Sequence, residues 1–212
     1  AEPEEILFLS GGTEANNMVI QGALGQREGA LVISSVEHPA VFNTAKRFEK
    51  QGREIRIVDV DESGVLDMER FIEALDTGSA SLVSIMTANN ETGALQPVKE
   101  FARYCREKGV PFHTDAAQAV GKIPVNVEEI GCDYLSVAAH KLGGPIGIGA
   151  LYIRGGAELN RLLEGGSQEV SRRPGTQAVA LAVGFGEACR IAKEQLPEEH
   201  DRIKKLRDEM ER

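Results

Sequence analysis

The stretch ILFLSGGTEANN at residues 6–17 contains the unit from which the fold can be read. Its first four residues are apolar and typical of a buried strand, and two glycines then allow a tight turn into a helix from about Glu14. A short apolar strand followed by a helical pattern recurs at 31–50, 55–75 and 82–108. This alternation predicts an α/β fold, a three-layer α/β/α sandwich with a mainly parallel sheet.

Further short apolar runs complete the predicted sheet, at 110–113, 134–138 and 150–153. The carboxyl ends of parallel strands meet at one edge of a sheet, and ligands bind in the crevice beyond that edge. Polar residues that follow the strands are therefore the first candidates for a functional site.

The C-terminal part of the chain follows a different pattern. A helix rich in small residues is predicted over 177–193, and Pro197 is expected to end it and begin another helical segment. The chain opens almost directly on its first strand, and 195–212 has no closing element. We therefore expect a large domain over 1–194, cut from a longer protein, and the start of a helix toward a further domain over 195–212.

Composition and charge argue against several classes of protein. Hydrophobic residues make up 42% of the chain and charged residues 27%, which is ordinary for a soluble globular domain. A formal charge of −9 without a basic cluster argues against a nucleic-acid partner, and no apolar run approaches the ~20 residues of a membrane helix. Cys105, Cys132 and Cys189 are too far apart for a zinc motif, and no metal site is expected. This cysteine usage favours a reducing cytoplasm.

Polar segments follow several of the predicted strands. Gly12 and Thr13 open the first helix, where free amides attract a phosphate, although a capped turn without a ligand has the same sequence. His38, Asn90 and Asp115 come directly after later strands. Each also has an ordinary alternative, as a surface histidine, a polar loop residue and a helix N-cap respectively.

The segment DYLSVAAHKLGGPIGIG at 133–149 contains the most informative candidate. Lys141 lies at the end of a predicted buried strand, with glycines beyond it. Removal of a lysine from water favours its neutral amine, which is a nucleophile toward aldehydes. A solvated lysine before a glycine-rich hairpin is the alternative, and the segment alone leaves both open. The position of all these segments at one predicted sheet edge favours a functional site.

Together these segments resemble the class V aminotransferase family, and within it the cysteine desulfurases of the NifS and IscS type. The matching stretches are SGGTEANN at 10–17, EHPA at 37–40, NNETG at 89–93, DAAQ at 115–118, AHKLGGPIGIGALY at 139–152 and RRPGT at 172–176. The resemblance implies the large domain of fold type I, without its usual N-terminal arm, and pyridoxal 5'-phosphate (PLP) as cofactor.

The resemblance also implies roles for residues around the cofactor ring. Lys141 would bind PLP covalently and, once released by the substrate, accept the α proton as a general base. Asp115 would pair with the ring nitrogen, and Gln118 and Asn90 would bond the phenolic oxygen side. His38 would stack on the ring face and help to move protons.

A second implied group lies at the cofactor phosphate. Gly12, Thr13 and His140 would hold the phosphate within the same subunit. Thr176, in the PGT motif, would reach the phosphate of a neighbouring subunit. The resemblance therefore implies a homodimer with shared sites.

The implied reaction converts cysteine to alanine and passes the sulfur to an enzyme thiol. In the family, that cysteine and the arginine that binds the substrate carboxylate lie beyond the PGT motif and beyond Arg212, so this chain alone is expected to be inactive. The eventual sulfur acceptor remains open between an iron–sulfur cluster scaffold, as in iron–sulfur cluster biogenesis, tRNA thiolation and another carrier protein. Alternatives are selenocysteine lyase, a serine or alanine aminotransferase, and a non-catalytic dimerisation module.

One position departs from the family pattern inside the implied site. Desulfurases usually have a hydroxyl residue three positions before the lysine, and here that residue is Ala138. Ser136 lies roughly 6–7 Å further along the same strand face, too far to replace it. A missing charge-assisted hydrogen bond would weaken PLP binding by about ten- to a hundredfold.

Overall fold

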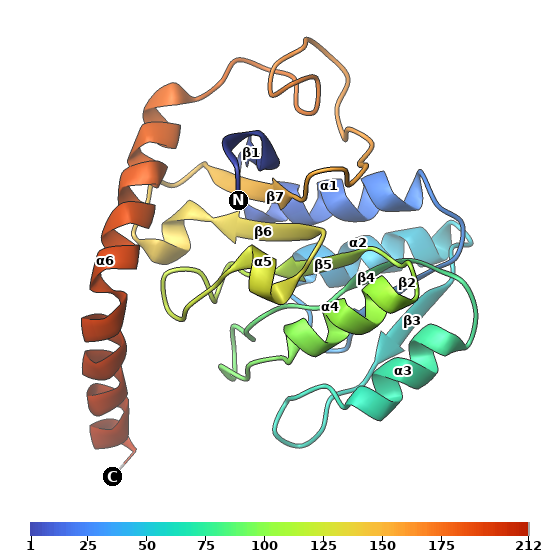
Figure 1. The fold of residues 1–212 in the computed structure, drawn as a ribbon, viewed down its shortest axis with the longest axis horizontal. Coiled ribbons are helices and arrows are strands. Elements are labelled where there is room, and N and C mark those ends of the chain that lie inside the picture. Colours follow the sequence, from blue (N-terminus) through green and yellow to red (C-terminus); the bar gives the residue numbers. More distant parts are fainter. Residues whose placement is uncertain (212) are drawn as a thin grey trace.

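A computed structural model of the protein describes residues 1–211, and a seven-stranded sheet forms its middle layer (Figure 1). The strands are β1 (Ile6–Leu9), β2 (Ala30–Ser34), β3 (Ile55–Val58), β4 (Ala80–Ser84), β5 (Phe112–Asp115), β6 (Tyr134–Ala138) and β7 (Gly149–Ile153). Their order in the sheet is β1-β7-β6-β5-β4-β2-β3. Over residues 1–211, β7 pairs antiparallel with β1 and β6, whereas the other neighbouring strands pair in parallel. The predicted mainly parallel sheet is confirmed.

Helices cover both faces of this sheet (Figure 1). The α-helices are α1 (Gly12–Leu24), α2 (Pro39–Lys50), α3 (Met68–Asp76), α4 (Val98–Glu107), α5 (Val127–Ile130) and α6 (Val179–Met210), with short 3-10 helices η1 (Pro3–Glu5) and η2 (Ala139–Leu142). Among the helices described over 1–211, none is long and apolar enough to cross a bilayer.

Each face of the sheet has its own apolar core. Met18 and Ile20 of α1 pack with Leu31 and Ile33 of β2 on one face. On the other face, Phe71 of α3 and Phe101 of α4 are fully buried, with ring centroids 4.5 Å apart. Burial of apolar surface on both sides therefore holds the three layers together, as the alternating pattern predicts.

The C-terminal helix differs from the sequence-based expectation. Instead of ending before Pro197, α6 begins at Val179 and continues through that proline to Met210. A proline removes one backbone N–H and strains the helix, but the residues around it are good helix formers. Arg190 pairs with Glu187 and Glu194 on adjacent turns. Local helix propensity and such pairs therefore outweigh the break that a single proline would cause.

A close approach of two backbones fixes the start of α1. A Cβ atom on Gly149 would lie 2.6 Å from the carbonyl oxygen of Val137 and 2.7 Å from Cα of Gly11. Only glycine allows this distance, so the turn between β1 and α1 can pack directly on β7. The N-terminus of α1 is thereby held next to the β6–β7 hairpin.

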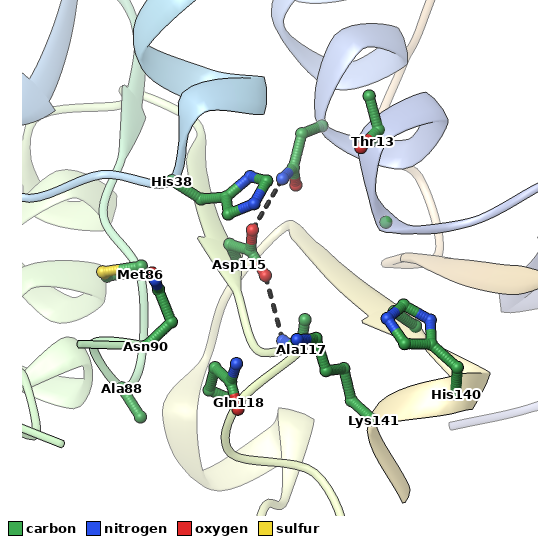
Figure 2. A pocket seen from close by; sticks show the side chains of 13 residues that line it. Thr13, His38, Met86, Ala88, Asn90, Asp115, Ala117, Gln118, His140 and Lys141 are labelled. Atoms are coloured by element: carbon green, nitrogen blue, oxygen red, sulfur yellow. Dashed lines mark hydrogen bonds between the residues drawn. The ribbon is translucent and has the colours of Figure 1, made fainter. Parts of the chain in front are cut away.

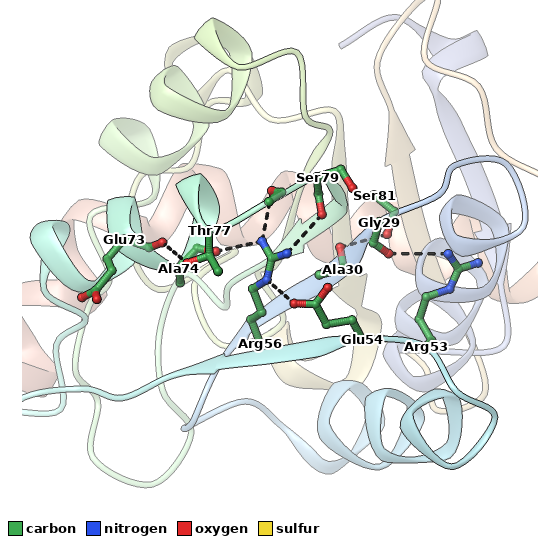
Figure 3. Close-up of polar contacts among 11 residues, drawn as sticks. Gly29, Ala30, Arg53, Glu54, Arg56, Glu73, Ala74, Thr77, Ser79 and Ser81 are labelled. Carbon is green, nitrogen blue, oxygen red and sulfur yellow. Dashed lines mark hydrogen bonds and ion pairs between the residues drawn. The ribbon is translucent and has the colours of Figure 1, made fainter.

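At the opposite edge of the sheet, two arginines bond backbone carbonyls of neighbouring segments, Arg56 at the end of α3 and Arg53 at Gly29 before β2 (Figure 3). Arg56 of β3 donates to the carbonyl oxygens of Ala74 in α3, at 3.0 Å, and of Gly78, at 3.1 Å. Arg53 donates to the carbonyl oxygen of Leu24 at the end of α1, at 2.7 Å. Cations at helix C-termini satisfy the last carbonyl groups and interact favourably with the helix dipole.

Replacing Arg56 by alanine is expected to lower the free energy of unfolding by about 1–2 kcal/mol, because charge-assisted bonds to part-buried and exposed carbonyls are lost. The side chain is only 12% exposed, so water cannot fully replace these contacts. Urea unfolding measures the change. Arg103, which is 74% exposed, is the matched control, and its alanine variant should change stability by less than about 0.5 kcal/mol. Equal losses of stability in both variants would show that the Arg56 contacts do not stabilise the fold specifically.

Candidate active site

A pocket of about 270 Å³ lies at the carboxyl edge of the sheet (Figure 2). It is bounded by the start of α1, the β2–α2 and β4–α4 connections, the end of β5 and η2. The predicted site residues found around it are Gly12, Thr13, His38, Asn90, Asp115, Gln118, His140 and Lys141. The structure therefore brings together every predicted site residue except Thr176, whereas their chemical roles remain predictions.

Asp115 is the buried carboxylate of this pocket. It is 6% exposed and ends β5, so it lies within the strand rather than after it as the sequence suggested. One oxygen, Oδ2, accepts a hydrogen bond from Nδ2 of Asn16 at 2.6 Å. The other, Oδ1, accepts from the backbone N–H of Ala117 at 2.9 Å. Two donors thus fix the orientation of the carboxylate, and sequence analysis missed the role of Asn16.

His38 is the N-cap residue of α2. Its Nδ1 accepts a hydrogen bond from the backbone N–H of Ala40 at 3.1 Å, so the neutral ring must have its hydrogen on Nε2. The ring lies close to Asp115 in the pocket (Figure 2). The helix cap therefore fixes both the position of the ring and its tautomer.

The turn after β4 is shaped by Asn89. Its Oδ1 accepts from the backbone N–H groups of Glu91 and Thr92, each at 2.9 Å, and its Nδ2 donates to the carbonyl of Val36 at 3.0 Å. These bonds tie the turn to the β2–α2 connection. Asn90 consequently lies on the pocket wall although its own side chain is exposed.

Lys141 lines the pocket from η2, one short turn beyond the end of β6. Its side chain is exposed in the structure, as in the solvated alternative that the segment left open. Gly143, two residues later, adopts a left-handed conformation (φ 83°) and ends η2. Lys122 lies nearby: burial lowers its pKa, and the positive charge of Lys141 lowers it further.

Ala138 lies against the first turn of α1. A Cβ atom on Gly12 would be 3.5 Å from Cβ of Ala138, so this methyl group faces the amides that open the helix. Ser136 is fully buried, and its hydroxyl bonds Nε2 of His113 at 2.9 Å. Ser136 does not line the pocket and does not compensate for the missing hydroxyl at 138.

Thr176 lies outside this pocket. It is exposed and lines a separate groove with Val179 and Val183 of α6. This groove also contains Arg173, whose guanidinium forms an ion pair with Glu14 at 3.0 Å. The RRPGT segment is therefore attached to the first turn of α1, but Thr176 points to a different surface from the other predicted site residues.

A family model for "Aminotransferase class-V" matches residues 1–211. The chain belongs to this family. It is 46% identical over 211 residues to a cysteine desulfurase IscS of Dictyoglomus turgidum, covering 98% of this chain and 53% of that protein. The fold of a solved NifS-like protein superposes with a TM-score of 0.93 at 38% identity, over 99% of this chain and 58% of that one. A structure described as SspA in complex with cysteine matches with a TM-score of 0.85 at 38% identity, over 90% of this chain and 56% of that one.

This class V aminotransferase chain spans about half the length of the curated relatives it matches. Cys105 and Cys132 are buried, and burial raises the pKa of both thiols, that of Cys132 to about 12. Cys189 is on the exposed side of α6, and its pKa is also raised by partial burial. None of these cysteines lines the pocket, so the part of the chain described, 1–211, provides no thiol beside Lys141.

A second buried carboxyl group lies behind the pocket and was not anticipated from the sequence. Glu37 is 7% exposed, and its Oε1 accepts from the hydroxyl of Ser34 at 2.6 Å and the backbone N–H of Met86 at 2.9 Å. Burial raises the pKa of Glu37 to about 8, and the charge of Asp115 adds to this rise. Glu37 is therefore protonated at neutral pH, so that Asp115 has a neutral acid as its neighbour.

The stability of this family member should consequently depend on pH in a defined way. Because the pKa of Glu37 is raised from 4.5 to about 8, its contribution is fully present below pH 4.5 and is lost as the pH rises to 8. Burial lowers the pKa of His113 from 6.5 to about 3, so its contribution is lost as the pH falls below 6.5. Between pH 4.5 and 6.5 the contributions of Glu37 and His113 to the unfolding free energy change in opposite directions with pH. Above pH 6.5 only the Glu37 contribution still changes.

Between pH 6.5 and 8 we expect the unfolding free energy to fall by about 2 kcal/mol more in the wild-type chain than in Glu37→Gln. Glutamine keeps the size of the side chain but has no titrating group. Urea unfolding at a series of pH values measures the difference. Parallel pH profiles for the two chains would show that Glu37 does not titrate in this range.

Proposed function

We propose that the pocket binds PLP and that this chain supplies the cofactor-binding half of a cysteine desulfurase. The observation that supports this most strongly is the placement of Lys141 and Asp115 around one pocket beside the N-terminus of α1. An amine for an aldehyde, a carboxylate for a ring nitrogen and free amides for a phosphate are the three groups that PLP requires.

The residues present fit the chemistry of PLP. The backbone N–H groups of Gly12 and Thr13 lie in the first turn of α1 and would hold the phosphate, together with His140. Asp115 has both oxygens oriented by donors and would pair with the ring nitrogen. Lys141 would form the covalent link through its amine.

The remaining pocket residues would orient the ring and move protons. Gln118 and Asn90 would bond the phenolic oxygen side, and His38 would cover one ring face with the hydrogen on Nε2 available as a donor. Bound PLP supplies an electron sink for the charge that remains on the substrate α carbon. The amine of Lys141 would remove the α proton as the general base.

Cysteine is the proposed substrate. The relatives with high identity are called cysteine desulfurases, and one structural relative is described with cysteine bound. The sulfur would pass to a thiol outside residues 1–211, because no cysteine described there lines the pocket. A sulfur-acceptor protein, a role in iron–sulfur cluster biogenesis and a cytoplasmic location remain predictions from the resemblance and the cysteine spacing.

We also infer a homodimer in which Thr176 serves the pocket of the neighbouring subunit. The groove that contains Thr176 is bordered by Val179 and Val183, which are 66% and 68% exposed, and Ile146 of the β6–β7 hairpin is 85% exposed. Exposed apolar side chains at one surface are typical of an association interface. The placement of Thr176 on this surface, outside its own pocket, supports the shared site.

A charged residue in this surface should separate the subunits. Val183→Glu is expected to shift sedimentation from dimer to monomer, because the interface would have to bury an unpaired carboxylate. Ile203→Glu is the control, since Ile203 is 55% exposed on the far part of α6. A monomeric wild-type chain, or a dimer that survives Val183→Glu, would contradict the proposed surface.

The proposed function is tested by following the α hydrogen of cysteine in deuterated water. The chain loaded with PLP should exchange this hydrogen, as measured by NMR, and the Lys141→Ala variant should not. Alanine and sulfide should stay near background without an added protein thiol. Rapid sulfide release by the chain alone would contradict the absence of a sulfur-accepting thiol, and exchange that persists in Lys141→Ala would contradict the role of Lys141.

A further inference from the structure

Asn16 is a buried polar side chain that belongs to the pocket. It is 1% exposed, lies in the second turn of α1 and lines the same cavity as Asp115 and Lys141. Its Nδ2 donates to Oδ2 of Asp115 at 2.6 Å, across 99 positions of sequence. Figure 2 shows this bond on the side of Asp115 opposite the loop that contains Ala117.

The charge on Asp115 determines how the amide of Asn16 is oriented. A carboxylate only accepts hydrogen bonds, so Nδ2 must face it, and the reverse orientation would bring two oxygens together. The second oxygen of Asp115 is occupied by the backbone N–H of Ala117. Over residues 1–211 no cation forms a salt bridge with this carboxylate, so these two neutral donors hold it in place.

The other end of the same amide indicates why an asparagine is present. Oδ1 of Asn16 is buried and has no hydrogen-bond partner among the residues described. A buried acceptor without a donor destabilises a fold. The neighbouring positions on α1, among them Ala15, Met18 and Val19, are buried and apolar. An apolar residue would suit the core better, and only the bond to Asp115 accounts for the amide.

We propose that Asn16 is a positioning residue that holds the Asp115 carboxylate toward the ring nitrogen of PLP and so keeps that nitrogen protonated. This inference rests on the proposed function. The bond from Nδ2 stabilises the ionised carboxylate and restricts its rotation, and an ionised, fixed carboxylate favours the protonated ring. Asn16 acts only through Asp115 and has no catalytic step of its own.

The probe is PLP labelled with ¹⁵N in the ring, bound to the chain and titrated by NMR. In Asn16→Ala we expect the ring nitrogen to lose its proton about one pH unit lower than in wild type, and the dissociation constant for PLP to rise about three- to tenfold. Asn16→Leu keeps a similar volume, removes the donor without adding a charge, and should show the same two changes. Gln21→Ala removes another amide of α1 outside the pocket and should match wild type.

The outcomes separate this inference from the proposed function. Circular dichroism checks that each variant folds, and the similarly sized Asn16→Leu remains informative where alanine does not fold. A wild-type chain that does not bind PLP would overturn both the proposed function and the role of Asn16. A wild-type chain that binds PLP, with both Asn16 variants equal to it in affinity and in the ¹⁵N titration, would overturn the role of Asn16 alone.

Discussion

Replacing Lys141 by alanine is expected to abolish covalent attachment of PLP, while replacing Lys122 should leave it intact. Both amines are close to each other, since the charge of Lys141 contributes to the lowered pKa of Lys122. They differ in position, because Lys141 lines the pocket and Lys122 donates to Oε1 of Gln118 from outside it, at 3.1 Å. Only the amine inside the pocket can meet an aldehyde that is held by the phosphate and ring contacts.

Reduction with borohydride converts the link into a stable bond that intact mass spectrometry detects. The wild-type chain and Lys122→Ala should each gain the mass of one reduced PLP, and Lys141→Ala should gain none. This loss is complete rather than partial, because the side chain contains the reacting atom. An equal mass gain in Lys141→Ala, or a loss of the mass gain in Lys122→Ala alone, would show that PLP is not attached to Lys141.

Ala138→Ser is expected to strengthen PLP binding by about ten- to a hundredfold, which corresponds to one charge-assisted hydrogen bond. The Cβ atom of Ala138 faces the first turn of α1, 3.5 Å from where a Cβ on Gly12 would lie. A hydroxyl on this atom would therefore point to the proposed phosphate position. The hydroxyl of Ser136 cannot take this role, because it bonds His113 in the core.

Fluorescence or absorbance titration with PLP measures this gain in affinity. Ala138→Val adds size without a hydroxyl and serves as the control, for which affinity should stay equal or fall. The gain should also disappear when free pyridoxal, which has no phosphate, replaces PLP. A serine variant with the affinity of the wild-type chain would contradict the placement of the phosphate next to residue 138.

The order of strands and helices follows from local sequence, but the bounds of β5 and of α6 do not. The strand β5 was expected at 110–113 and lies at Phe112–Asp115, because the polar residues Thr114 and Asp115 conceal its end. His113 and Thr114 are fully buried, and their polar atoms bond Ser84, Ser136 and Thr87 on neighbouring strands. A polar residue can be buried when it has hydrogen-bond partners on neighbouring strands, and a single sequence does not reveal those partners.

The site also divides into residues that local sequence could predict and residues that depend on distant partners. The residues that directly follow strands, such as His38 and Asn90, could be placed at one sheet edge because parallel strands align their carboxyl ends. Asn16 and Glu37 could not be recognised, since their bonds join Asp115 and Met86, which are 99 and 49 positions away. The exposure of Lys141 was also not fixed by the sequence, because its segment alone left a buried and a solvated lysine equally open.

A crystal structure of the chain soaked with PLP tests the binding of this cofactor most directly. The proposed function predicts continuous electron density from Nζ of Lys141 into the pocket, with the ring nitrogen beside Asp115 and the phosphate at the start of α1. An empty pocket with the Lys141 side chain turned into solvent, at a PLP concentration that saturates binding in solution, would contradict it.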